Sequence, residues 1–344
     1  MAIVDILSKT EIKKYDYPPV FDRNERTEAF KPNSAATKFM ASIRLPENKV
    51  GFLLQYGYFV STRKFFTPEV FYKTDISHVL SSLGIESDYH EDLYEKNTRK
   101  KHRTAILGIF ACRSFGPEEK GHLIEYTNQL TKNILNSKTI FSDLLRYLND
   151  RKTELPSYAK LSKVISMSLL ERERLLLKTI RDKFPRDAQM HVDELISNDL
   201  DLSKIDDTER NKYKISFLKS IDKESSPSAI ASNIERIKKL KVYYVAFREL
   251  IEVLDLNIDG FKFYSDYVSK IKFTQMKQMT DDKVKLYLIS FIYIKFLELN
   301  DVLTVTLLKE VQANKNLIQR RFDEWNAQYR MKDAVSTKTV LWDV

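Results

Sequence analysis

The sequence predicts an all-α protein with several domains. Seven glycines and nine prolines in 344 residues leave few of the tight turns that all-β and doubly wound α/β proteins need. Lys, Leu, Glu, Ile and Arg fill the windows between these breakers, and apolar residues recur there at helical spacing. We therefore expect helices in almost every segment.

The charge balance suits a polyanionic partner. The chain carries 57 Lys and Arg against 48 Asp and Glu, a formal net charge of +9, and its 43% hydrophobic content is that of a globular protein. An excess of positive charge favours nucleic acid or an acidic membrane face as a partner. Many soluble proteins share such an excess, so charge alone does not choose a function.

The sequence lacks the usual motifs of metal, cofactor and catalytic sites. A single cysteine, Cys112, excludes an internal disulfide, and the five histidines lack metal-ligand spacing. Phosphate-loop, dinucleotide, zinc-protease and serine-hydrolase motifs are missing. We therefore expect no cofactor, no metal, no small-molecule substrate and no catalytic centre in this chain.

The N-terminus lacks the basic-then-apolar layout of a signal peptide. The longest apolar stretch, residues 284–299, is too short for a bilayer helix and contains Lys285, Lys295 and Glu298. We expect a buried core helix there, no membrane partner, and a cytosolic protein.

The N-terminal third reads as short helices followed by a strongly apolar one. Asp22 or Asn24 is a candidate N-cap, an apolar helix is expected from about Glu47 after Pro46, and Gly84 is a candidate C-cap. The aromatic residues in this region could stack on bases, but their density in an apolar run favours the core: Tyr56, Tyr58, Phe59, Phe65, Phe66 and Phe71. Cys112 is expected to be a small buried hydrophobe.

The segment "YEKNTRKKHRTAILGIFACRSF", residues 94–115, concentrates positive charge. Five Lys or Arg and one His lie between Lys96 and Arg103, with no acid among them. If Asn97 or Thr98 caps a helix here, Arg99, His102 and Arg103 share one face, and a bound phosphate would offset cations at the helix N-terminus. A start near Asp88 would weaken that argument, and a solvated charged face is the alternative.

Residues 160–184 show the clearest helical periodicity. The apolar side is formed by Leu161, Ile165, Leu169, Leu176, Ile180 and Phe184, and the opposite side by Lys160, Lys163, Arg174, Lys178 and Arg181. A basic stripe of this kind is typical of phosphate-backbone binders and also of ordinary surface helices.

Composition suggests four regions. Residues 1–115 and 116–185 form two helical modules, and Phe184-Pro185 marks a boundary. Residues 186–230 are a polar, partly acidic linker, and residues 231–344 are helical again, with a long amphipathic helix near 301–330 that is a possible dimerisation or interaction segment.

Several of these segments together resemble the N-terminal region of Tn3-family transposases, the domain of unknown function DUF4158. The segments are "LSKTEIKKYDYPPVFDRNERTEAF", "RLPENKVGFLLQYGYFVSTRKFFTPEVFYKTDISHVLSSLGI", residues 94–115, and "ELPSYAKLSKVISMSLLERERLLLKTI". Their order and spacing hold across about residues 1–184. The "GIFACRSF" stretch departs from the family's Gly-Phe-Arg pattern, which puts Arg113 in doubt as a contact.

The resemblance implies helix-turn-helix-like DNA-binding modules followed by a helical bundle region. It implies a DNA-binding protein that grips double-stranded DNA at transposon terminal inverted repeats, in a bacterial cytoplasm in association with the nucleoid. Implied contacts are Arg99, Lys100, Lys101, His102, Arg103, Lys49, Arg63, Lys64, Lys160, Lys163, Arg174, Lys178 and Arg181. The family's RNase H-like Asp-Asp-Glu domain is not in this sequence, so the chain is expected to be a truncated, non-catalytic transposase.

Three other functions remain open. The chain could inhibit a full-length transposase by occupying the transposon ends, or pair with that transposase or with itself. It could be a helical dimerisation scaffold without DNA binding. It could also complete an active site together with a separate C-terminal chain.

Overall fold

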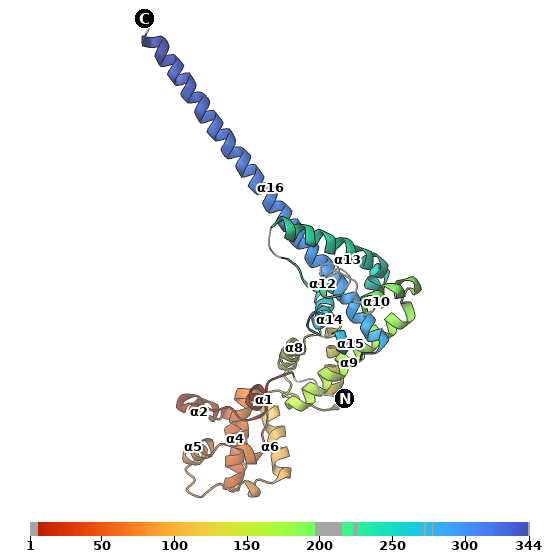
Figure 1. The fold of residues 1–344 in the computed structure, drawn as a ribbon. Helices are drawn as coiled ribbons and strands as arrows, with labels where there is room; N and C mark the ends of the chain where they lie inside the picture. The colour runs from red at the N-terminus through yellow and green to blue at the C-terminus, as the bar shows by residue number, and fades with distance from the viewer. Residues whose placement is uncertain (1–5, 197–214, 223–225, 272, 277, 343–344) are drawn as a thin grey trace. The chain divides into compact units, whose positions relative to one another are not determined.

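The computed structural model describes residues 6–196, 215–222, 226–271, 273–276 and 278–342. Within these ranges the fold is all-α, as predicted: it contains helices and a single isolated β-bridge, between Arg113 and Thr153, but no strand (Figure 1). None of the helices formed by these residues is both long enough and apolar enough to cross a bilayer. The chain divides into two compact units, residues 1–175 and 176–344.

Unit 1 contains nine α-helices among its described residues. They are α1 (Lys9–Asp16), α2 (Arg23–Ala29), α3 (Ser34–Ala41), α4 (Pro46–Thr62), α5 (Lys73–Leu83), α6 (Lys96–Ile109), α7 (Pro117–Leu130), α8 (Ser137–Asp150) and the first part of α9 (Tyr158–Lys183). Two short 3-10 turns, η1 (Pro68–Val70) and η2 (Glu91–Leu93), lie between them.

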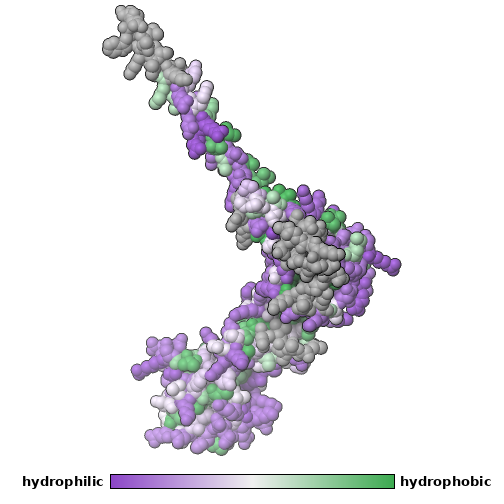
Figure 2. All heavy atoms as spheres, viewed as in Figure 1, coloured by the Kyte–Doolittle hydropathy of each residue, from purple (hydrophilic) through white to green (hydrophobic). Residues whose placement is uncertain are grey.

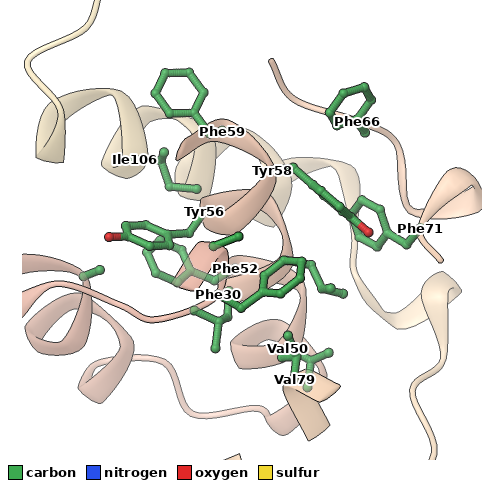
Figure 3. Packing of buried hydrophobic residues seen from close by; sticks show 14 of the residues in the cluster. Phe30, Val50, Phe52, Tyr56, Tyr58, Phe59, Phe66, Phe71, Val79 and Ile106 are labelled. Atoms are coloured by element: carbon green, nitrogen blue, oxygen red, sulfur yellow. The ribbon is translucent and has the colours of Figure 1, made fainter. Parts of the chain in front are cut away.

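Helix α4 is the centre of the first hydrophobic core. Every residue from Val50 to Phe59 is buried, because this helix is apolar on all sides and other elements surround it. Figure 3 shows the aromatic side chains of α4, Phe52, Tyr56, Tyr58 and Phe59, projecting from it in different directions. The aromatic run is therefore core, as the sequence favoured.

The sequence signals at the ends of α2, α4 and α5 have the predicted effect. Asp22 caps α2, with its side chain accepting from the Glu25 N–H at 2.8 Å. Pro46 is the first residue of α4, where its missing N–H costs nothing. Gly84 ends α5 in the left-handed conformation, with φ of 63°.

A second hydrophobic core in unit 1 is built from α7, α8 and α9. Its buried residues include Leu123, Ile140, Leu144, Leu161 and Ile165. The N-terminal segment joins it: Ile6 is buried there, and its N–H donates to the Tyr158 hydroxyl at 3.1 Å. The expected first module began at residue 1, whereas the segment from Ile6 to Tyr15 packs in this second core.

Unit 2 is a helical bundle. Its helices are the end of α9, α10 (Gln189–Ile196), α12 (Ile215–Lys219), α13 (Pro227–Val253), α14 (Ile258–Lys270), α15 (Phe273–Met276) and α16 (Asp281–Trp342), with the 3-10 turn η3 (Arg186–Ala188). The apolar stretch 284–299 is the first part of α16 and packs against α13 and α14 as core, which confirms that prediction. Leu286, Leu288, Ile289 and Phe291 are fully buried.

The division between the units falls inside α9, ten residues before the expected boundary at Pro185. The proposed polar linker, 186–230, contains helical turns: η3, α10 and α12 lie in it, and Val192, Leu195, Ile215 and Leu218 are buried. Its residues 197–214 and 223–225 lie outside the described part of the chain.

Candidate nucleic-acid interface

Helix α6 carries the basic cluster. It begins at Lys96 after the N-cap Glu95, whose side chain makes no capping hydrogen bond, so neither Asn97 nor Thr98 is the cap and the alternative start near Asp88 is also wrong. The first turn contains no acidic residue. Lys96, Arg99, Lys100 and Lys101 therefore all lie in the first two turns, where the positive end of the helix dipole adds to their charge.

Four cations of α6 line a groove beside this helix. Lys96, Arg99, Lys100 and Arg103 form one wall, and the other wall is the chain that follows α4: Phe65, Phe66 and Thr67, with Gln55 behind them. The groove has a volume of about 270 Å³. It is lined by no acidic side chain.

The groove wall opposite α6 is held in place by a buried amide. The Gln55 side chain donates to the Phe66 carbonyl at 2.5 Å and accepts from the Phe66 N–H at 3.3 Å. Such a two-way contact fixes the backbone at residues 65–67 relative to α4. The spacing between this wall and the α6 cations is therefore set by the core.

Charge on α6 is only partly neutralised. Arg99 is 3.8 Å from Glu69, a long contact between two partly exposed groups. Lys96, Lys100 and Lys101 are exposed and have no carboxylate within 4.0 Å among the described residues. An anion that enters the groove would meet two cations without an ion-pair partner among the described residues, Lys96 and Lys100, while Lys101 lies on the same helix outside the groove.

Arg103 has a structural partner. Its guanidinium forms a two-pronged ion pair with the carboxylate of Glu154, with Nε 2.9 Å from Oε2, and its Cζ lies 5.4 Å from the Phe65 ring centroid. Nearly half of the Arg103 side chain remains exposed. An anion would therefore meet an arginine whose positive charge is already paired with Glu154.

His102 is not on the basic surface, which corrects its assignment as a DNA contact. It is buried, its Nδ1 lies 2.9 Å from the Tyr94 hydroxyl, and it packs edge-on to Phe39 and Phe52. Burial lowers the pKa of its imidazole to about 4. It is therefore a neutral core residue at pH 7. Although Arg99, His102 and Arg103 are neighbours on one side of α6, His102 points into the core while Arg103 is exposed and Arg99 is half-buried.

Lys64 is also a core residue rather than an exposed contact. Its ammonium donates to the Tyr15 carbonyl at 2.7 Å and to the Asp16 carboxylate at 2.8 Å, and it lies 3.6 Å from the Tyr15 ring centroid. Burial lowers its pKa. This lysine joins α1 to the end of α4 and is not available to a ligand.

The remaining predicted contacts near α4 are partly exposed. Arg63 is the left-handed C-cap of α4, with φ of 56°, and its guanidinium is 3.1 Å from the sulfur of half-buried Cys112. Cys112 packs against the first core but is only half-buried, which is less than predicted. Lys49 is half-buried in the first turn of α4.

The five basic residues predicted to form a stripe on α9 differ in their surroundings: three are exposed lysines, and two are arginines in ion pairs. In unit 1, Lys160 and Lys163 are exposed and line a second groove, of about 370 Å³, together with Lys120 of α7. Arg174 pairs with Glu171 on the same helix at 2.7 Å. In unit 2, Lys178 is exposed, and Arg181 pairs with Asp282 of α16 at 2.6 Å.

Two cations of these grooves, Lys96 and Lys120, were not among the predicted contacts. Lys96 belongs to the charge run of residues 96–103 but not to the contacts predicted within it. Lys120 lies in α7 and reaches the α9 lysines only through tertiary packing, which no local pattern reveals. Within the described residues, no group of three His, Cys, Asp or Glu is placed to hold a metal ion.

Comparison with known families supports part of the sequence interpretation. Residues 6–167 match the family described as "Domain of unknown function (DUF4158)", a little under half of the chain. The match confirms the predicted resemblance to this domain and covers both cores of unit 1 and helix α6. No curated protein matches the chain.

Proposed function

We propose that unit 1 binds double-stranded DNA through the basic groove of α6. One observation carries the proposal: Lys96, Lys100 and Lys101 are exposed, close together in sequence, and without a carboxylate partner among the described residues. Keeping like charges together at a helix N-terminus is unfavourable unless an anion binds there. Duplex DNA supplies a row of phosphates, and Lys and Arg contacts to them account for most of the affinity of non-specific binding.

The match to DUF4158 and the motifs of residues 1–184 extend the proposal. By resemblance, the chain is the end-binding part of a Tn3-family transposase, and its natural ligand is a terminal inverted repeat. In this proposal Arg99 and Lys100 contact phosphates or base edges from α6. Lys160 and Lys163 provide a second contact from α9, on the surface that they share with Lys120. The chain binds the transposon end and does not cut it.

The test is fluorescence anisotropy of the full chain with two labelled duplexes, one carrying an inverted-repeat end and one with the same bases scrambled, across a salt series. We expect tighter binding to the end and a steep fall in affinity with salt. Arg99→Ala/Lys100→Ala removes two phosphate contacts, so it should weaken binding to both duplexes and make the salt slope shallower by about two.

The matched control is Lys132→Ala/Arg146→Ala, which removes the same charge from exposed positions outside both grooves. It should change the affinity little, because charge loss far from the ligand acts only through screened long-range fields. If both double variants weaken binding equally, the effect is net charge and the α6 groove is not the contact. No binding to either duplex would contradict the proposed function itself.

A further inference from the structure

The exposed face of α9 in unit 1 combines cations with apolar side chains. Its members follow one another at alternating steps of three and four residues and so share one side of the helix: Lys160, Lys163, Met167, Leu170 and Arg174. Met167 is 55% exposed and Leu170 41% exposed, and neither packs in a hydrophobic core of unit 1. Single exposed apolar side chains are common on protein surfaces, but two neighbours in the middle of a basic face indicate a ligand that carries both negative charge and an apolar group.

The same face borders the groove between α7 and α9. Three of the residues that line this groove of about 370 Å³ are exposed lysines, Lys120, Lys160 and Lys163, and a fourth is Met167. None of the three lysines has a carboxylate within 4.0 Å among the described residues. The rest of the lining carries no charge: Phe115, Gly116, Pro117, Ile124 and Val164. A ligand at this groove therefore meets unpaired positive charge directly beside an apolar surface.

We propose that residues 160–174 of α9 lie in the major groove of the bound duplex, where Met167 and Leu170 contact the C5-methyl groups of thymines. This contact rests on the proposed DNA binding and adds a preference for A·T pairs to it. Lys160 and Arg174 are separated by about 21 Å along the helix at 1.5 Å per residue, more than the roughly 12 Å width of the major groove. A helix that crosses the groove therefore places the cations at the ends of this face near phosphates and the residues in its middle over base edges.

The chemistry of the base edges selects thymine. Among the four standard bases, all present hydrogen-bonding groups in the major groove, and the thymine methyl is the one apolar group there. Met167 and Leu170 offer an apolar surface and no hydrogen-bond donor. Over a G·C pair they would cover donors and acceptors without replacing the bonds that these make to water, which is unfavourable. Over an A·T pair the same side chains bury a methyl group, which is favourable.

A protein partner fits this patch less well than DNA. Stable protein–protein interfaces bury roughly 800 Å² on each partner, whereas the apolar part of this face is the exposed half of one methionine and the exposed two-fifths of one leucine. On the face of unit 1 that Figure 2 shows, hydrophilic side chains predominate and hydrophobic ones form small, separate patches. The three unpaired lysines beside Met167 instead suit a row of phosphates.

The experiment is fluorescence anisotropy of the full chain with an alternating A·T duplex and with the same duplex carrying deoxyuridine for every thymidine. The exchange removes only the C5-methyl groups and leaves charge and hydrogen-bonding groups unchanged. We expect the parent to bind the thymine duplex at least about fourfold more tightly, the value for burying one methyl group. Met167→Ala/Leu170→Ala should lower this ratio to about one, with the salt slope unchanged because no phosphate contact is lost.

The matched control is Leu175→Ala/Met190→Ala, which removes the same atoms from exposed positions outside this face and should keep the parent ratio. A second duplex pair adds the methyl group instead of removing it. An alternating G·C duplex with 5-methylcytosine for cytosine carries a methyl at the same groove position. The parent should bind it more tightly than the unmethylated duplex, and Met167→Ala/Leu170→Ala should not.

Equal binding of the parent to the thymine and uracil duplexes would overturn the methyl contact and leave the proposed DNA binding intact. A ratio that survives Met167→Ala/Leu170→Ala would do the same. The patch would then belong to another partner, such as an acidic protein segment. Binding to no duplex at all would contradict the proposed function itself, and the methyl contact with it.

Discussion

The Arg103 guanidinium on the basic helix is fixed by Glu154, a carboxylate that is only 3% exposed and also accepts the Phe115 N–H at 2.7 Å. Residue 103 belongs to the first core's helix α6, and residue 154 lies just before α9. The pair therefore joins the charge run to the segment that leads into the second core, and it makes one member of the basic cluster a structural residue.

We expect Arg103→Ala to lower the free energy of unfolding by about 1–2 kcal/mol, because it leaves the buried Glu154 carboxylate with one fewer partner while half of Arg103 was already solvated. Urea unfolding followed by circular dichroism measures it. Lys100→Ala, at an exposed position on the same helix, should stay within about 0.5 kcal/mol of the parent. Equal losses for the two variants would mean that the ion pair contributes nothing specific.

Lys64→Ala should destabilise unit 1 by about 2–3 kcal/mol. The change removes the donor to the Tyr15 carbonyl and to Asp16, and it leaves a gap beside the Tyr15 ring. Thermal or urea unfolding is the measurement. Lys49→Ala is the control, because that lysine is half-buried in α4 and its ammonium makes no hydrogen bond or ion pair with the described residues. The salt slope of DNA binding should be unchanged by Lys64→Ala in protein that remains folded.

The buried imidazole of His102 makes stability depend on pH. Its pKa is about 4 in the folded chain, below the ordinary value of 6.5, so the unfolded chain binds a proton between these values and the folded chain does not. Stability is fully present above pH 6.5 and is lost as pH falls toward 4, by roughly 3 kcal/mol at most.

His102→Gln is the variant that isolates this effect. Its unfolding free energy should be lower at pH 7 but should fall less than that of the parent between pH 6.5 and 4, whereas His90→Gln, at an exposed position, should follow the parent curve. Parallel pH curves for the parent and His102→Gln would show that the buried imidazole does not carry the dependence.

Gly57→Ala should destabilise, against the usual effect of replacing a helix glycine. A Cβ at position 57 would lie 2.1 Å from a carbon of the Phe30 ring, so the ring or α4 must shift, and we expect a loss of about 1–3 kcal/mol. Gly121→Ala, on α7, meets no atom within 4 Å and should stabilise by about 0.5–1 kcal/mol. Urea unfolding of both variants gives the comparison, and a gain at Gly57 would contradict the close packing of α4 on Phe30.

The sequence by itself determined the all-α fold and several helix ends, although not the start of α6. The scarcity of glycine and proline, the Asp22 cap, Pro46 and Gly84 act within one or two turns, so their effects could be predicted without a structure. The apolar stretch 284–299 was equally readable, because a helix with only three charged residues among sixteen is apolar on every face and must be buried.

Only the tertiary structure decided which cations are free. His102 and Lys64 carry the same sequence signal as Lys100 and Lys101, yet the first two are buried against Tyr94 and Tyr15. Arg103 and Arg181 meet carboxylates that are 51 and 101 residues away in sequence. Helical periodicity assigns a side chain to a face of its own helix, but which face is covered, and by which charge, depends on packing between segments distant in the chain.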